Sequence, residues 1–208
     1  MIGNLILAAA IGLFSSAASQ TPQAPAPTLD RPVLLIIDIQ NFYFEGGEIP
    51  LVGSVKASLR AKSLLEAFRS HNLPVIHVAH MPKEKPENKD PQYDLHPNVA
   101  PRPDEPVVVK HYADAFRETD LLDRLRALGA KTVVICGMQT HMCVEAATRH
   151  AADIGFEVVL AEDACATRDL KYKETTVPAA SVHAAVLAAM NGTYAKIATV
   201  AEIAAALN

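Results

Sequence analysis

Positive charge is the first thing that the sequence lacks. The chain of 208 residues carries 19 Lys and Arg against 23 Asp and Glu, so its formal net charge is −4 at pH 7. Nucleic acids and anionic membrane surfaces are bound through clusters of positive charge, and this composition has no such excess. We therefore expect no nucleic acid partner, and a small neutral or mildly charged molecule as the substrate or ligand.

Cysteine is also scarce. The chain has three cysteines, an odd number that leaves at least one free thiol in any internal pairing. Cys136 lies in a predicted buried strand and Cys165 in a predicted loop, which is not the pattern of a disulfide framework. No Cys-X-X-Cys motif is present, so a redox-sensing thiol protein is a poorly supported alternative for this chain.

No hydrophobic run is long enough for a confident membrane span. Leu5–Phe14 is an uncharged apolar run that the small residues of Ser15–Ser19 follow. This pattern predicts a signal peptide over residues 1–19 and a periplasmic or secreted protein without stable membrane insertion after processing. The α-amino group is the only positive charge before the run, so an uncleaved anchor is the alternative. Residues 20–31 are rich in Pro and Ala and predict a linker.

Residues 32–208 are predicted to form one domain, because 50% hydrophobic and 20% charged residues suit a sizeable core. Segments with one apolar helical face alternate with short apolar runs. This alternation predicts a doubly wound, three-layer α/β fold with a six-stranded, mostly parallel sheet. The predicted strands are Val33–Ile37, Val75–Ala79, Val107–Val109, Thr132–Cys136, Val158–Ala161 and Ala195–Ala198.

Three connecting segments carry further expectations. Met81–Pro106 is Pro-rich and charged, which indicates a long surface excursion, either a binding loop or a solvated insertion. Residues 162–169 are expected to be a loop, in which Asp163 has a structural role. Thr199 and Glu202 have the spacing of a capping box at the start of the terminal helix.

Cys143 is the residue that the sequence marks most clearly as a candidate for a chemical role. A buried strand ends at Gly137, and the helix that follows places Cys143 in its first turn. Unpaired backbone N–H groups and the helix dipole favour a thiolate there, and the same N–H groups could bind an oxyanion. The alternative is that Cys143 is a small buried apolar residue, as most free cysteines are.

Two charged residues are expected to meet this cysteine. Asp38 ends the first strand and Lys110 ends the third. The carboxyl ends of parallel strands share one edge of the sheet, and ligands bind there where the winding reverses. Lys110 would lower the thiol pKa and Asp38 would accept its proton, which completes a nucleophilic site. For each residue alone, a solvated strand end is the alternative.

Three motifs resemble the isochorismatase-like cysteine hydrolases: DIQNFYF with Asp38, VVVKHYADAF with Lys110, and CGMQTHMCVEAATRHA with Cys143. The resemblance covers Pro32–Asn208. It implies a sheet of six parallel strands and an Asp-Lys-Cys triad that hydrolyses C–N bonds through a thioester. It also implies a cis peptide bond before Gln139, and an oxyanion hole formed by the backbone N–H groups of Gln139 and Cys143.

Departures within that family narrow the expected activity. Isochorismatases proper generally lack the nucleophilic cysteine, so Cys143 favours an amidase. Related nicotinamidases carry an Asp and two His as a metal site, but this sequence has no matching Asp-X-His spacing, and His77 and His80 fall on opposite faces of a strand. We predict no metal and no cofactor. A nicotinamidase-type deamidase and a non-catalytic binding or assembly protein of the same fold remain the alternatives.

The resemblance leaves the substrate unnamed. Phe42, His80 and Phe116 border the predicted site and are candidates to line the substrate pocket, although core packing would explain each of them equally well. Family members commonly form oligomers, so a homo-oligomer is expected.

Overall fold

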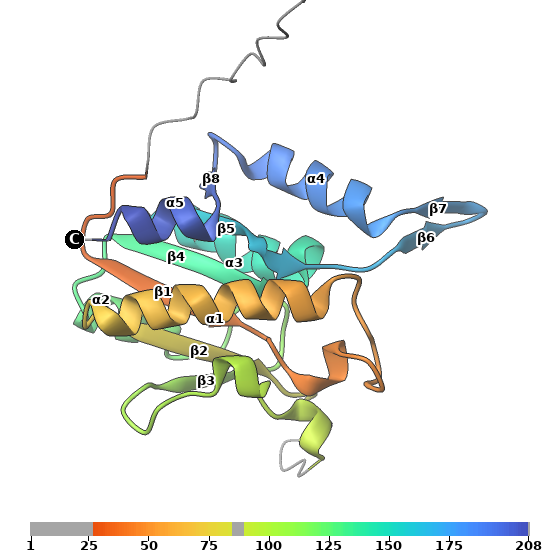
Figure 1. The fold of residues 1–208 in the computed structure, drawn as a ribbon, viewed down its shortest axis with the longest axis horizontal. Helices are drawn as coiled ribbons and strands as arrows, with labels where there is room; N and C mark the ends of the chain where they lie inside the picture. Colours follow the sequence, from red (N-terminus) through yellow and green to blue (C-terminus); the bar gives the residue numbers. More distant parts are fainter. Residues whose placement is uncertain (1–26, 85–89, 208) are drawn as a thin grey trace, which may run out of the picture.

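The computed structural model describes residues 27–84 and 90–207, and a parallel sheet forms its centre (Figure 1). Six strands lie in the order β3-β2-β1-β4-β5-β8, and every neighbouring pair is parallel. This confirms the predicted fold class. The strands are β1 (Pro32–Ile37), β2 (Val75–His80), β3 (Val107–Lys110), β4 (Thr132–Met138), β5 (Glu157–Ala166) and β8 (Lys196–Ala198). The predicted signal peptide and residues 20–26 of the predicted linker lie outside the described residues.

The central strands are apolar on both faces because helices cover both. Every residue of β1 and β4 is buried. A run such as Val133–Ile135 therefore carries no polar alternation and is typical of a doubly covered parallel strand.

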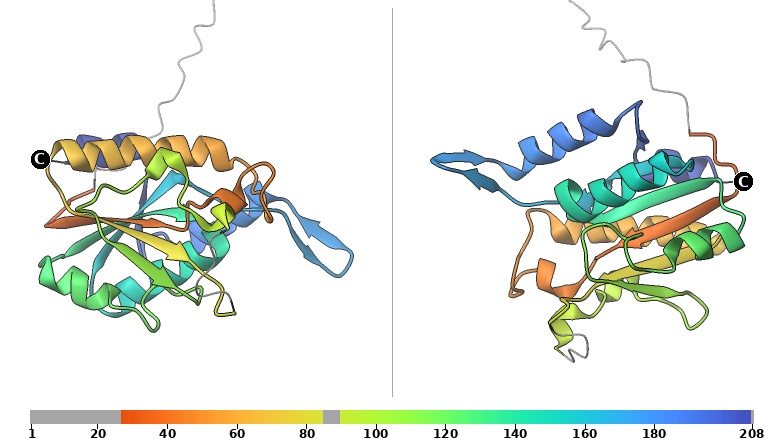
Figure 2. Two further views of the ribbon diagram at one scale, coloured as in Figure 1. Left: turned by 90° about the horizontal axis from the view of Figure 1, so that it is seen from below. Right: turned by 180° about the vertical axis from the view of Figure 1, so that it is seen from behind.

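Helices form the outer two layers. α1 (Ser54–Ser70) and α5 (Val200–Ala205) pack on one face of the sheet, and α2 (Leu121–Ala127), α3 (Glu145–Asp153) and α4 (Ala179–Met190) pack on the other. In the left view of Figure 2, α1 lies above the sheet, and α2 and α3 lie below it. None of the helices in residues 27–84 and 90–207 has the length and hydrophobicity that a membrane crossing needs.

The last helix begins as its sequence predicts. The Thr199 hydroxyl accepts a hydrogen bond from the backbone N–H of Glu202, and the Glu202 side chain accepts one from the backbone N–H of Thr199. Asp163 adds a third bond, because its Oδ1 accepts from the backbone N–H of Val200 at 2.8 Å. Its carboxylate therefore joins β5 to the start of α5, in agreement with a structural role.

The segment after β5 differs from the expected loop. β5 continues to Ala166, and β6 (Leu170–Tyr172) and β7 (Thr175–Val177) follow as an antiparallel hairpin that projects from the body (Figures 1 and 2). The sequence between these strands lacks the Gly or Asn that usually marks a tight hairpin turn. Lys173 takes the left-handed backbone conformation instead, with φ of 52°.

The excursion between β2 and β3 is anchored where it returns to the sheet. Its described part contains two short 3-10 turns, η2 (Pro91–Tyr93) and η3 (Pro97–Val99). Glu105 forms a 2.7 Å ion pair with Arg69 of α1 and a 3.0 Å contact with buried His77 of β2. These bonds connect three elements at the end of the sheet opposite the carboxyl edge.

The strand order creates one reversal of winding. The chain proceeds from β1 to β2 and β3 in one direction, and from β4 to β5 and β8 in the other, so β1 and β4 are neighbours at the switch point. Loops leaving these two strands diverge and open a crevice at the carboxyl edge. Candidate site residues therefore gather beyond Ile37 and Met138.

Candidate active site

Three elements bring the predicted nucleophile and its partners to the carboxyl edge. Asp38 directly follows β1, and Lys110 is the last residue of β3. Cys143 lies in η4 (Thr140–Val144), a single π-helical turn that joins β4 to α3. Asp38 and Lys110 are fully buried, and Cys143 is 5% exposed. None of the three is a solvated strand end.

Lys110 bridges the other two residues. Its Nζ lies 2.7 Å from Oδ2 of Asp38 and 3.3 Å from Sγ of Cys143, and it donates a hydrogen bond of 3.0 Å to the carbonyl oxygen of Tyr112. The long side chain of Lys110 reaches across the end of β2, which lies between β3 and β1. A carboxylate, an ammonium and a thiol separated by about a hundred residues of chain thus meet at one point, as the parallel-sheet argument predicts.

The electrostatic balance at this point differs from the expectation for the thiol. Burial opposes the charge of Lys110, but Asp38 and Cys143 outweigh burial and raise its pKa, so the ammonium persists. Burial and then the Asp38 carboxylate raise the pKa of Cys143 to about 12, although Lys110 acts in the opposite direction. In the resting state the thiol therefore keeps its proton beside a carboxylate that can accept it.

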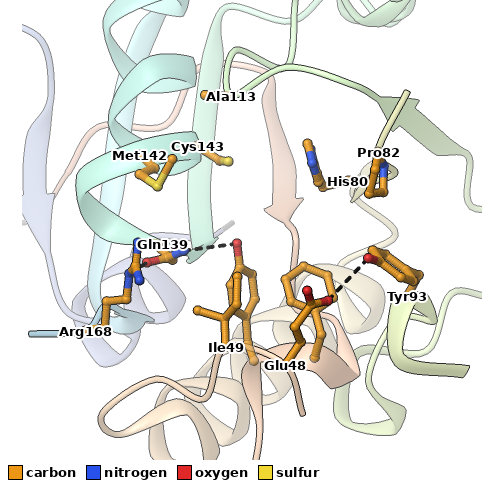
Figure 3. A pocket seen from close by; sticks show the side chains of 12 residues that line it. Glu48, Ile49, His80, Pro82, Tyr93, Ala113, Gln139, Met142, Cys143 and Arg168 are labelled. Carbon is orange, nitrogen blue, oxygen red and sulfur yellow. Dashed lines mark hydrogen bonds between the residues drawn. The ribbon is translucent and has the colours of Figure 1, made fainter. Parts of the chain in front are cut away.

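A cavity of about 300 Å³ opens beside the sulfur (Figure 3). Phe42 and His80 line it, together with Cys143 and Gln139. Phe116 is not among its lining residues. Its ring instead stacks on His150 of α3, with ring centroids 4.7 Å apart.

Gln40 holds together two residues that line this cavity, His80 and Tyr93. Its Nε2 donates to the carbonyl oxygens of His80 and Tyr93, and its Oε1 accepts from the backbone N–H of His80 at 2.8 Å. One buried amide therefore ties the end of β1 to the end of β2 and to the excursion. Burial and the nearby charge of Lys110 lower the pKa of His80, which keeps its ring neutral at pH 7.

The side chain of Gln139 forms part of one wall. The peptide bond between Met138 and Gln139 is cis, as the resemblance implies. Gln139 Nε2 lies 3.3 Å from the Tyr43 hydroxyl, and Arg168 Nε donates to Gln139 Oε1 at 3.1 Å. Figure 3 shows Gln139 and Arg168 on one side of the cavity and His80 and Tyr93 on the other.

Several lining residues were not predicted from the sequence. Tyr43 is adjacent to Phe42 in the motif that follows β1, so that motif could have indicated it. Tyr93 comes from the Pro-rich excursion, which therefore contributes to the cavity. Arg168 follows the end of β5, and no periodicity marks it. The unpredicted lining residues are Tyr43, Glu48, Ile49, Pro82, Tyr93, Ala113, Met142 and Arg168.

The two histidines of β2 have separate environments. His77 Nε2 contacts Glu105 at 3.0 Å, whereas His80 lines the cavity. Within residues 27–84 and 90–207, no group of three or more His, Cys, Asp and Glu side chains is arranged to hold a metal ion.

The protein is a three-layer α/β protein in which a carboxylate, an ammonium and a thiol meet beside a cavity at the switch point of the parallel sheet. A model of the isochorismatase domain matches residues 32–202. The chain belongs to the isochorismatase family of hydrolases.

Individual relatives agree with this assignment. The isochorismatase family protein YddQ of Bacillus subtilis is 41% identical over 172 residues, which cover 80% of this chain and 94% of that protein. Maleamate amidohydrolase of Pseudomonas putida is 30% identical over 156 residues, which cover 66% of this chain and 73% of that enzyme. A crystal structure of an isochorismatase hydrolase from Oleispira antarctica is 41% identical, with a TM-score of 0.80 over 88% of this chain and 100% of that chain.

Proposed function

We propose that this protein hydrolyses the C–N bond of a small amide through a thioester on Cys143. The observation that carries the proposal is the position of Lys110, whose ammonium contacts both Asp38 and Cys143 beside a cavity. A buried cysteine with only a packing role needs neither a carboxylate nor an ammonium beside it. The similarity to a maleamate amidohydrolase supports an amide as the substrate class.

The first step is activation of the thiol. As Sγ of Cys143 attacks the carbonyl carbon of the amide, its proton passes to the Asp38 carboxylate. Lys110 stays charged throughout and stabilises first the Asp38 carboxylate and then the negative charge that develops on Sγ as its proton leaves. Proton transfer during attack suits a thiol whose pKa is raised to about 12, since a free thiolate is rare at neutral pH.

The remaining steps reuse the same carboxylate, first as a proton donor and then as a proton acceptor. The carbonyl oxygen becomes an oxyanion that the backbone N–H groups of Gln139 and Cys143 hold. Asp38 then returns its proton to the nitrogen of the leaving amine, the C–N bond breaks, and a thioester remains on Cys143. The Asp38 carboxylate next takes a proton from water as the water oxygen attacks the thioester carbonyl. The C–S bond of the resulting tetrahedral intermediate then breaks, Asp38 returns this proton to Sγ of Cys143, and the carboxylic acid leaves.

The volume and the lining of the cavity limit which molecules can be substrates. About 300 Å³ admits a small molecule and excludes a folded polypeptide. Phe42, Tyr43 and Tyr93 contribute aromatic rings to its walls, Glu48 contributes a carboxylate, and Arg168 contributes a guanidinium. We therefore expect a compact amide with an apolar or planar body.

The test is a library of small primary and secondary amides, with release of ammonia or amine as the readout. Cys143→Ala is expected to abolish turnover while it preserves the melting temperature. Cys136→Ala is the matched control, because that thiol is fully buried in β4 and does not line the cavity. Turnover that survives Cys143→Ala contradicts the proposal. A wild-type protein that turns over no amide and forms no thioester favours a binding protein of the same fold.

A further inference from the structure

Tyr43 places a buried side chain in the wall of the cavity that Cys143 also lines. It is the last residue of η1 (Asn41–Tyr43), the 3-10 turn that follows Asp38, and it is 5% exposed. Its ring packs against Phe42 with centroids 4.1 Å apart. Tyr43 lines the cavity together with Gln139 and Cys143. A buried hydroxyl in this position needs partners for both its oxygen and its hydrogen.

The contacts of Gln139 define what the hydroxyl oxygen does. Arg168 Nε is only a donor, so the Gln139 atom that faces it at 3.1 Å must be the acceptor Oε1. The other end of the same amide, Nε2, therefore faces Tyr43 and donates to its oxygen at 3.3 Å. Because the Tyr43 oxygen accepts this bond, its own hydrogen points elsewhere. Within the described residues, no hydrogen bond donated by this hydroxyl is found.

The Tyr43 hydroxyl keeps its proton at neutral pH. Burial raises the pKa of Tyr43 far above its ordinary value, and the negative charges of Asp38 and Cys143 raise it further. A neutral donor at this position keeps its proton while negative charge develops on a substrate.

We propose that the Tyr43 hydroxyl donates a hydrogen bond to the carbonyl oxygen that Cys143 attacks. It acts as a third donor beside the backbone N–H groups of Gln139 and Cys143. The inference rests on the proposed function and extends it to a catalytic residue. The amide of Gln139 aims the hydroxyl, and Arg168 in turn fixes the amide. Arg168 and Gln139 thus form a chain of hydrogen bonds that orients one O–H group before the substrate enters.

The test compares two reactions of the same sulfur and needs no knowledge of the natural substrate. With 4-nitrophenyl acetate, Sγ adds to a carbonyl, an oxyanion forms, and 4-nitrophenolate leaves a thioester behind. With iodoacetamide, Sγ displaces iodide from an sp³ carbon and no oxyanion forms. Tyr43→Phe is expected to slow acylation about tenfold or more and to leave the alkylation rate unchanged, because only acylation uses the hydroxyl.

Tyr172→Phe is the matched control. Tyr172 lies on the exposed hairpin of β6 and β7 and does not line the cavity, so the variant removes a tyrosine hydroxyl away from the site. Both rates should match wild type in this variant. Equal acylation by Tyr43→Phe and wild type overturns the inference and leaves the proposed function standing. A parallel loss of both rates in Tyr43→Phe also overturns it, because the tyrosine would then support the nucleophile. A 4-nitrophenolate burst that is equal in wild type and Cys143→Ala contradicts the proposed function itself, and this inference with it.

A second variant separates donation from indirect positioning. Gln139→Ala removes the side chain that Tyr43 contacts but retains the backbone N–H of residue 139. If the hydroxyl donates to the carbonyl oxygen, adding Tyr43→Phe to Gln139→Ala lowers the acylation rate further. If Tyr43 acts only by holding the Gln139 side chain, the second substitution has no added effect and the inference fails.

Discussion

The ammonium of Lys110 and the carboxylate of Asp38 form a 2.7 Å ion pair from which solvent is fully excluded. Lys110→Met is expected to lower the free energy of unfolding by about 3–5 kcal/mol, because it leaves Asp38 charged and uncompensated in the interior. Urea denaturation at pH 7 measures this loss. Adding Asp38→Asn removes the unpaired negative charge from the interior, so the double variant should be more stable than Lys110→Met alone. A Lys110→Met variant as stable as wild type would disprove the pairing.

A glycine beside the site has no room for a side chain. Gly137 pairs with Ile37 across β4 and β1, and a Cβ on Gly137 would overlap the backbone carbonyl of Ile37. Gly137→Ala should therefore cost more than about 4 kcal/mol or prevent folding. Gly155→Ala is the control, because Gly155 also has a positive φ, of 96°, but open space around it. There only the backbone penalty of about 1–2 kcal/mol applies. Similar melting temperatures for the two variants would contradict this packing.

Glu105 predicts a pH dependence of stability. Burial alone raises its pKa, but hydrogen bonds from Arg69, the backbone N–H of Arg102 and His77 outweigh burial and lower it from 4.5 to about 2. A depressed pKa means that the folded state favours the carboxylate. The Glu105 carboxylate therefore contributes on the order of 3 kcal/mol to the free energy of unfolding. This contribution is complete above pH 4.5 and is lost as the pH falls toward 2.

The matching experiment is chemical denaturation of wild type and Glu105→Gln between pH 7 and pH 3. The wild type should be the more stable at pH 7, and the difference should narrow below pH 4.5. A difference that stays constant over this range would show that Glu105 is not held as a carboxylate by Arg69 and His77.

The three cysteines should differ in reactivity toward iodoacetamide. Cys143 lines the cavity, whereas Cys136 is fully buried and Cys165 donates to the carbonyl oxygen of Ala161. Labelling followed by peptide mapping should find Cys143 modified first. Because burial and Asp38 raise the pKa of Cys143 to about 12, its rate should rise about tenfold per pH unit between pH 7 and pH 10. Equal labelling of all three thiols, or a rate that is already constant at pH 7, would contradict this electrostatic balance.

The sheet could be predicted because its strands are buried on both faces. A run such as Val33–Ile37 has few alternative structures, and the alternation of strands with helices leaves one common topology. The hairpin of β6 and β7 could not be predicted, since its exposed residues, such as Tyr172, carry neither apolar alternation nor a turn signal. The C-terminal part of β5, beyond Ala161, was not predicted for a related reason. Small residues such as Ala164 and Ala166 occur in loops and strands alike.

The candidate site also has a part that could be predicted from the sequence and a part that could not. The meeting of Asp38, Lys110 and Cys143 follows from strand ends in a parallel sheet, so sequence order was enough to predict it. The wall formed by Tyr43 and Arg168 depends on where two loops cross, and periodicity carries no information about that. The pKa of Cys143 was expected to fall, because the sequence revealed the nearby ammonium but not the degree of burial that outweighs it.

The most direct test of the central claim is the mass of the intact protein during turnover of an amide from the library. Acid-quenched wild-type enzyme should carry an added mass equal to the acyl group of that amide, and peptide mapping should locate it on Cys143. The same sample of Cys143→Ala should carry no adduct and release no amine. Amine release without an adduct, at a rate that Cys143→Ala preserves, would contradict the account.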